Sequence, residues 1–96
     1  MQGQLVVFDT YTKAVDLMGR VRGVDYVLVI PPDKTGRVHV LCRSRQVADT
    51  ASEKLPKSTK HDWQNLGYYL VEAVCTNEDA ARFLGFRLAA RRKVEV

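Results

Sequence analysis

Four runs of apolar and β-branched residues stand out along the chain, and they predict β-strands over residues 4–9, 24–30, 37–43 and 68–75. The first two runs are almost continuously apolar, which is typical of strands buried on both faces. The third run alternates, with Val38, Val40 and Cys42 on one side and mostly polar residues on the other. A turn signal at residues 33–36 separates the second run from the third and predicts that the two strands pair as a hairpin.

Between these strands, apolar residues recur at the spacing of an α-helix and predict three helices. The stripes are Ala14, Met18 and Val21 in the first helix, Val47, Ala51 and Leu55 in the second, and Ala80, Ala81, Leu84 and Leu88 in the third. Gly23 ends the first helix, and Ser44 and Pro56 are placed to begin and end the second. Thr76 begins the third helix, whose far end carries a basic cluster at residues 91–93. Residues 57–65 are polar and predict a loop.

The predicted order of elements is β-α-β-β-α-β-α, within a single domain that spans residues 1–96. The first six elements follow the split β-α-β order of ferredoxin-like domains, to which the last helix is an addition. We therefore expect an α/β fold of the α+β kind, with a mixed sheet packed by helices.

The composition is that of an ordinary globular domain, because 46% of the 96 residues are hydrophobic and 27% are charged. No apolar run approaches the ~20 residues of a membrane span, and the N-terminus lacks the pattern of a signal peptide. We therefore expect a cytoplasmic, intracellular protein without a membrane role. The net charge of +4 favours anionic partners such as nucleic acid or nucleotides.

The two cysteines, Cys42 and Cys75, each end an apolar run and lie outside any Cys-x-x-Cys pair. Buried free thiols are the favoured state, although a disulfide stays open if the third and fourth strands are neighbours. Two cysteines and two scattered histidines lack the ligand spacing of a zinc site. We expect no metal and no cofactor.

The most basic stretch lies between residues 41 and 61, where five Lys or Arg residues stand against only Asp49 and Glu53. Guanidinium, ammonium, hydroxyl and imidazole groups all bind phosphate oxygens well. The candidate nucleic-acid-binding residues are Arg43, Ser44, Arg45, Lys57, Ser58, Thr59, Lys60 and His61. An equally simple interpretation makes the arginines solvated or paired with Asp49 and Glu53, and makes the lysines part of a solvated turn.

Motifs of catalysis are missing from the sequence. Acidic residues are scattered, with no Asp-x-Asp, Asp-His-His or His-Glu-x-x-His group, no Gly-x-x-x-x-Gly-Lys loop and no Gly-x-Ser-x-Gly. We assign no catalytic residue, and an enzyme acting on nucleotides is the least favoured class.

Two motifs stand out in the order of the chain, Gly-Val-Asp-Tyr-Val-Leu-Val-Ile at 23–30 and Gly-Arg-Val-His-Val-Leu-Cys-Arg-Ser-Arg at 36–45. In these motifs, and in the order and spacing of elements over nearly its whole length, the chain resembles the DHH-associated domain, the C-terminal module of DHH-type phosphoesterases such as RecJ-like exonucleases and nano-RNases. The first motif is similar to the family's strand entry and the second to its second strand. His61 falls where the family has the histidine of a glycine run, and residues 57–60 replace the glycines. The resemblance implies a free-standing nucleic-acid-binding module whose ammonium and hydroxyl groups take over the contacts of glycine N–H groups.

We expect a small non-catalytic module that binds single-stranded DNA or RNA through phosphate contacts, as a subunit of a replication or repair assembly. The alternative is a protein-interaction or self-associating scaffold subunit, a homodimer included, with the same fold and no nucleic-acid role. An open strand edge, or an exposed apolar patch around Phe83, Phe86 and Leu88, would indicate this second class.

Overall fold

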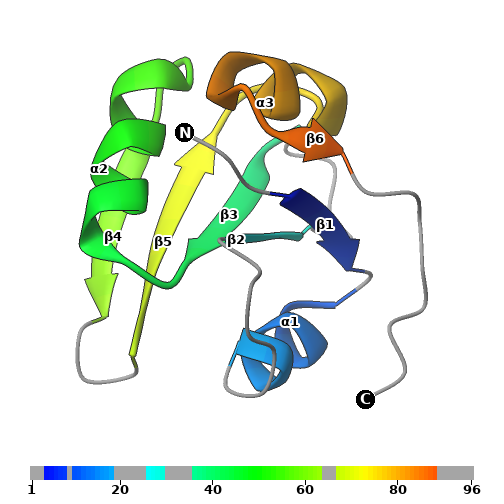
Figure 1. Ribbon diagram of the computed structural model, residues 1–96, viewed down its shortest axis with the longest axis vertical. Coiled ribbons are helices and arrows are strands. Elements are labelled where there is room, and N and C mark those ends of the chain that lie inside the picture. Colours follow the sequence, from blue (N-terminus) through cyan, green and yellow to red (C-terminus); the bar gives the residue numbers. More distant parts are fainter. Residues whose placement is uncertain (1–3, 9, 19–25, 30–35, 64–66, 89–96) are drawn as a thin grey trace.

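A mixed β-sheet lies at the centre of the protein and has helices on both faces (Figure 1). The computed structural model describes residues 4–8, 10–18, 26–29, 36–63 and 67–88, apart from the side chains of residues 62 and 63. The elements are β1 (Gln4–Phe8), α1 (Tyr11–Met18), β2 (Tyr26–Val29), β3 (Val38–Cys42), α2 (Arg45–Lys54), β4 (Thr59–Trp63), β5 (Tyr68–Ala73), α3 (Asn77–Leu84) and β6 (Arg87–Leu88). Within these ranges, no helix is both long enough and apolar enough to cross a membrane.

The strands follow the order β4-β5-β3-β2-β1-β6 across the sheet. β1 runs parallel to both of its neighbours, β2 and β6, whereas β3 is antiparallel to β2 and β5, and β4 is antiparallel to β5. The register aligns Val7, Leu28, Val40 and Val71 in one row and places Lys60 at the end of it. An apolar row therefore crosses the sheet from β1 to β5 and becomes polar at the edge strand β4.

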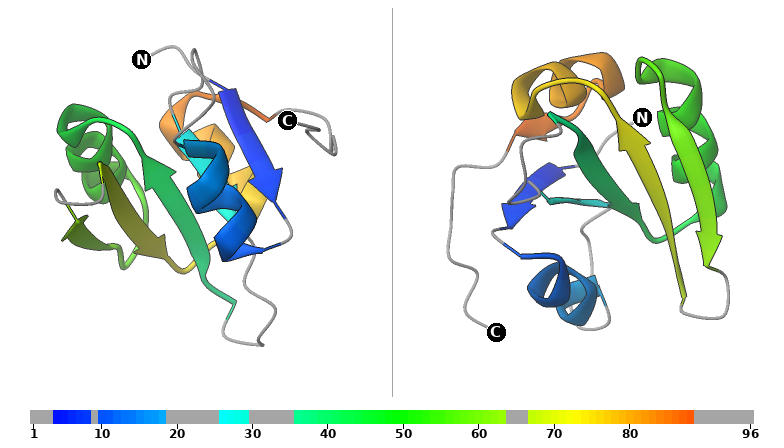
Figure 2. Two further views of the ribbon diagram at one scale, coloured as in Figure 1. Left: turned by 90° about the horizontal axis from the view of Figure 1, so that it is seen from below. Right: turned by 180° about the vertical axis from the view of Figure 1, so that it is seen from behind.

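The central strands are buried on both faces, because their alternating side chains enter two separate apolar clusters. Leu28, Val40 and Val71 belong to the cluster that also contains the small apolar residues of α2 and α3, such as Ala51. Leu41 and the other residues of the central strands that point to the opposite face belong to the second cluster, which α1 covers. The two views in Figure 2 show this division of the helices between the faces. Alanine at the contact positions lets α2 and α3 lie close to the sheet.

Most of the predicted architecture is confirmed. The chain forms one α/β domain with a mixed sheet packed by helices, and β2 pairs with β3 as the predicted hairpin. Ser44 caps α2, and Thr76 caps α3. Gly23, most of the turn at 33–36 and the basic residues 91–93 lie outside the described residues.

The prediction of a loop over residues 57–65 is wrong, because Thr59–Trp63 forms the edge strand β4. Its residues show no apolar alternation, yet their backbone groups complete the hydrogen bonding of β5. The split order of the first β-α-β unit is also not observed, since β1 and β2 are direct neighbours in the sheet. The connection from β1 through α1, which lies on one face of the sheet, therefore places β2 directly beside β1.

The third predicted helix is too long. α3 ends at Leu84, and Gly85 follows it in the left-handed conformation with φ 69°. This conformation closes the helix and redirects the chain, so that Arg87–Leu88 pairs with β1 as β6. Leu88 therefore contributes to the sheet rather than to a helical stripe.

The two cysteines are free, and the open possibility of a disulfide is excluded. β3 and β5 are neighbours, but their antiparallel register pairs Cys42 with Tyr69 and Val38 with Ala73. Cys75 follows Ala73 and so lies beyond the opposite end of the ladder from Cys42. Cys42 is buried as predicted, whereas Cys75 is only half-buried.

Candidate nucleic-acid interface

Ser44 and the arginines on either side of it lie where β3 passes into α2. Ser44 has an extended backbone, and its Oγ accepts a hydrogen bond of 3.1 Å from the backbone N–H of Val47. This N-cap accounts for the serine through the stability of the helix alone. Arg43 and Arg45 are both exposed beside the cap. The junction thus presents two guanidinium groups close to the N-terminus of a helix.

The charge at the start of α2 is opposite to what the helix dipole favours. A helix N-terminus carries partial positive charge and is stabilised by acidic side chains. α3 follows this rule, with Glu78 and Asp79 in its first turn and Arg82 in its last. α2 has no acidic residue in its first turn and begins with Arg45. The helix dipole therefore does not explain an arginine at this position.

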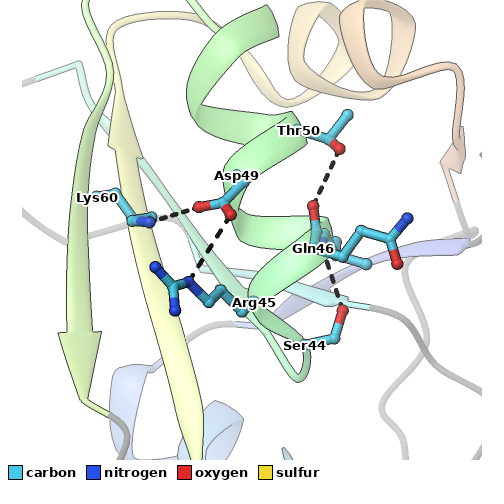
Figure 3. Close-up of polar contacts among 7 residues, drawn as sticks. Ser44, Arg45, Gln46, Asp49, Thr50 and Lys60 are labelled. Atoms are coloured by element: carbon cyan, nitrogen blue, oxygen red, sulfur yellow. Dashed lines mark hydrogen bonds and ion pairs between the residues drawn. The ribbon is translucent and has the colours of Figure 1, made fainter.

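Asp49, one turn further along α2, brings Arg45 and Lys60 together (Figure 3). The ammonium group of Lys60 donates a hydrogen bond to Asp49 Oδ1, and Arg45 Nε lies 3.9 Å from Asp49 Oδ2. Lys60 reaches α2 because its side chain projects from the face of β4 that continues the row of Val71. The hydrogen bond from Lys60 lowers the pKa of Asp49 below its ordinary value of 3.8. Asp49 is therefore an anion at neutral pH.

The turn between α2 and β4 contains Lys57 and Ser58. Ser58 Oγ donates a hydrogen bond of 2.5 Å to the backbone carbonyl of Ser52, which ties the turn to α2. Lys57 is exposed and has φ 49°, in the left-handed region that residues other than glycine adopt uncommonly. A ten-residue helix is about 15 Å long, so Lys57 lies well away from Arg43 and Arg45 at the other end of α2.

Thr59 and His61 lie on the opposite face of the sheet from Lys60, because side chains alternate along β4. His61 Nε2 is 3.5 Å from Oε1 of Glu72 on β5. The predicted set of eight residues therefore does not form one surface. Arg45 and Lys60 meet on the α2 face, while Thr59 and His61 project from the other.

The sequence did not indicate the polar group that surrounds Glu72 on this second face. His39 Nε2 lies 3.7 Å from Glu72 Oε1, and Arg37 Nη1 lies 3.5 Å from Oε2. His39, His61 and Glu72 come from β3, β4 and β5, and Arg37 directly precedes β3. The alternation of polar residues along 37–43 indicated that Arg37 and His39 share one face. Their partner, Glu72, could not be predicted, because it depends on the register between strands. In the described part of the chain, no group of three or more His, Cys, Asp or Glu side chains is arranged to hold a metal ion.

No family model, curated protein or solved structure matches this chain.

Proposed function

We propose that the protein is a small non-catalytic module that binds the phosphates of single-stranded nucleic acid where the N-terminal half of α2 lies beside β4. The observation that carries this proposal is the convergence of Arg45 and Lys60, from separate elements, on the two oxygens of Asp49. A phosphate group presents oxygens of the same kind to the same donors. Arg43 adds a further guanidinium group just before α2, where β3 passes into the helix.

Two further features support the proposal. The partial positive charge at the N-terminus of α2 attracts the same anion as Arg45, and no acidic side chain in the first turn opposes it. The net charge of +4 raises the local concentration of a polyanion around the whole protein.

A relationship to DHH-associated domains is part of the same proposal. Lys57 begins the segment that replaces the family's glycine run, and its φ of 49° is one that glycine adopts readily. A backbone that keeps a conformation suited to glycine supports the alignment of residues 57–60 with that run. The role as a subunit of a replication or repair assembly follows from the resemblance alone and stays a prediction.

Fluorescence anisotropy with labelled oligo(dT) and oligo(U) of about 12 nucleotides tests the binding. With about three or four phosphates contacted, log K should fall by roughly 0.7 per contact for each unit of log salt. Affinity should then drop about 20- to 50-fold between about 50 and 200 mM salt. The double variant Arg45→Ala/Lys60→Ala should reduce the slope by about 1.4, because two phosphate contacts are lost.

The matched control is Lys13→Ala/Arg87→Ala, which removes two exposed cations on α1 and on β6, the strand at the other edge of the sheet. It should leave the salt slope close to that of the wild type. Absence of binding at about 50 mM salt, or an equal loss in the control, would contradict the proposal.

One observation favours a second candidate function, a protein-interaction subunit. β4 pairs only with β5 among the described residues, so one edge of β4 is open to a strand from a partner. The predicted apolar patch is reduced to Phe83, which is 43% exposed, because Phe86 is buried and Leu88 is partly buried. Light scattering over a concentration series would show self-association, and a monomer at every concentration would count against a homodimer.

A further inference from the structure

Asp49 holds the two cations that the proposed function assigns to a phosphate, so any role of Asp49 in binding rests on that function. We infer that the Asp49 carboxylate occupies the phosphate position of the free protein, and that a nucleic-acid strand has to displace it. Asp49 would then be a built-in competitor that weakens binding.

The two contacts of Asp49 differ in a way that suits exchange. The Arg45 side chain is 73% exposed, and its Nε lies 3.9 Å from the carboxylate, so the guanidinium donors stay open to solvent. The Lys60 side chain is 28% exposed and donates a hydrogen bond to the other oxygen. A phosphate can therefore approach from the Arg45 side while Lys60 is already held in place. Arg45 has five N–H donors and Lys60 has three, so each can begin a new contact before it leaves Asp49.

The strength of these contacts also permits displacement. The Asp49 side chain is 47% exposed, and ion pairs at such positions are weak and screened by salt. A strand that contacts several phosphates replaces both ion pairs with charge-assisted hydrogen bonds of its own. The remaining cost is the negative charge of Asp49, which stays beside the bound phosphate. Removal of that charge should therefore strengthen binding.

Asp49→Asn tests this inference, because asparagine keeps the shape of the side chain and one carbonyl oxygen for Lys60. The matched control is Glu53→Gln, one turn further along α2, which changes the net charge equally. Glu53 is exposed and forms no ion pair with another residue that the structure describes. With labelled oligo(dT) of about 12 nucleotides at about 50 mM salt, Asp49→Asn should bind roughly three- to tenfold more tightly than the wild type. Glu53→Gln should change the affinity less than about twofold.

The possible results distinguish a failure of the inference from a failure of the proposed function. If the wild-type protein does not bind, the proposed function fails. If the wild type binds and Asp49→Asn gains no more than Glu53→Gln, only the net charge matters and the inference is overturned. Weaker binding by Asp49→Asn overturns it too, because Asp49 would then be a positioning residue for Arg45 and Lys60.

A measurement on the wild-type protein keeps the inference testable even if Asp49→Asn does not fold. The carboxyl carbon of Asp49 can be followed by NMR while oligo(dT) is added. Displacement should shift this resonance in proportion to the bound fraction, whereas the carboxyl carbon of Glu53 should move little. An Asp49 resonance that stays unchanged at saturation would overturn the inference.

Discussion

Cys42 and Cys75 share one chemistry but lie at different depths, and their reactivity should differ accordingly. Burial raises the pKa of the Cys42 thiol to about 12. Burial also raises the pKa of Cys75, with a smaller contribution from Asp79, but this thiol is only half-buried. Since the thiolate is the nucleophile, iodoacetamide at about pH 8 should modify Cys75 first. Mass spectrometry of peptides would check the order, and faster modification of Cys42 would contradict its burial.

The same burial makes stability fall at alkaline pH. The ordinary pKa of a thiol is 9.0, so the unfolded chain releases the Cys42 proton above pH 9 while the folded protein keeps it until about pH 12. The contribution is complete below pH 9 and is lost as the pH rises through that window, by up to about 1.4 kcal/mol per pH unit. Urea unfolding at several pH values would measure this loss. Cys42→Ala should show a shallower alkaline decline than the wild type.

At the scale of elements, the structure shows which boundaries are set by residues close in the sequence and which are set by contacts with distant parts of the chain. The start of α2 was predictable, because Ser44 forms its cap with a residue only three positions away. Strand β4 was not, since Thr-Lys-His-Asp-Trp has neither an apolar run nor an apolar alternation. What makes it a strand is the unpaired edge of β5, which comes after it in the chain. A single-sequence pattern does not contain that information.

Gly85 sets the boundary between α3 and β6, and its replacement tests that role. Its φ of 69° is costly for a residue with a Cβ atom, although nothing lies within 4 Å of the position that a Cβ would take. Gly85→Ala should therefore lower the free energy of unfolding by about 1–2 kcal/mol through backbone strain alone. Gly85→Asn should cost less, because asparagine tolerates this conformation. Equal losses in urea denaturation would show that strain is not the cause.

At the scale of the whole molecule, the basic stretch was predictable but its division between two faces was not. The sequence places Lys60 and His61 side by side, and strand alternation sends them to opposite faces. Which acids they meet depends on the neighbours of β4: Asp49 lies across from it on α2, and Glu72 lies beside it on β5. The pairing of strands and the packing of α2 on the sheet decide both contacts. Neither the pairing nor the packing can be deduced from the spacing of residues along the sequence.

Two phenylalanines near the end of the described chain show how strongly packing separates similar residues. Phe86 is 7% exposed, and its ring stacks on that of Tyr26 with centroids 4.1 Å apart. This contact fastens the segment after α3 to β2 across the core. Phe83 is 43% exposed, and its described ring contact is with the guanidinium of Arg82, 5.7 Å from the ring centroid.

Alanine substitution should therefore separate the two positions sharply. Phe86→Ala removes a buried ring and should cost about 3–5 kcal/mol, a large part of the ~5–15 kcal/mol that stabilises a typical domain. Phe83→Ala should cost no more than about 0.5–1 kcal/mol, because the ring is already partly in water and its cation–π contact is weak at an exposed site. Urea denaturation followed by circular dichroism would compare the two variants. A similar cost at both positions would mean that Phe83 is covered in solution, as expected if α3 contributed to the interface of a protein-interaction subunit.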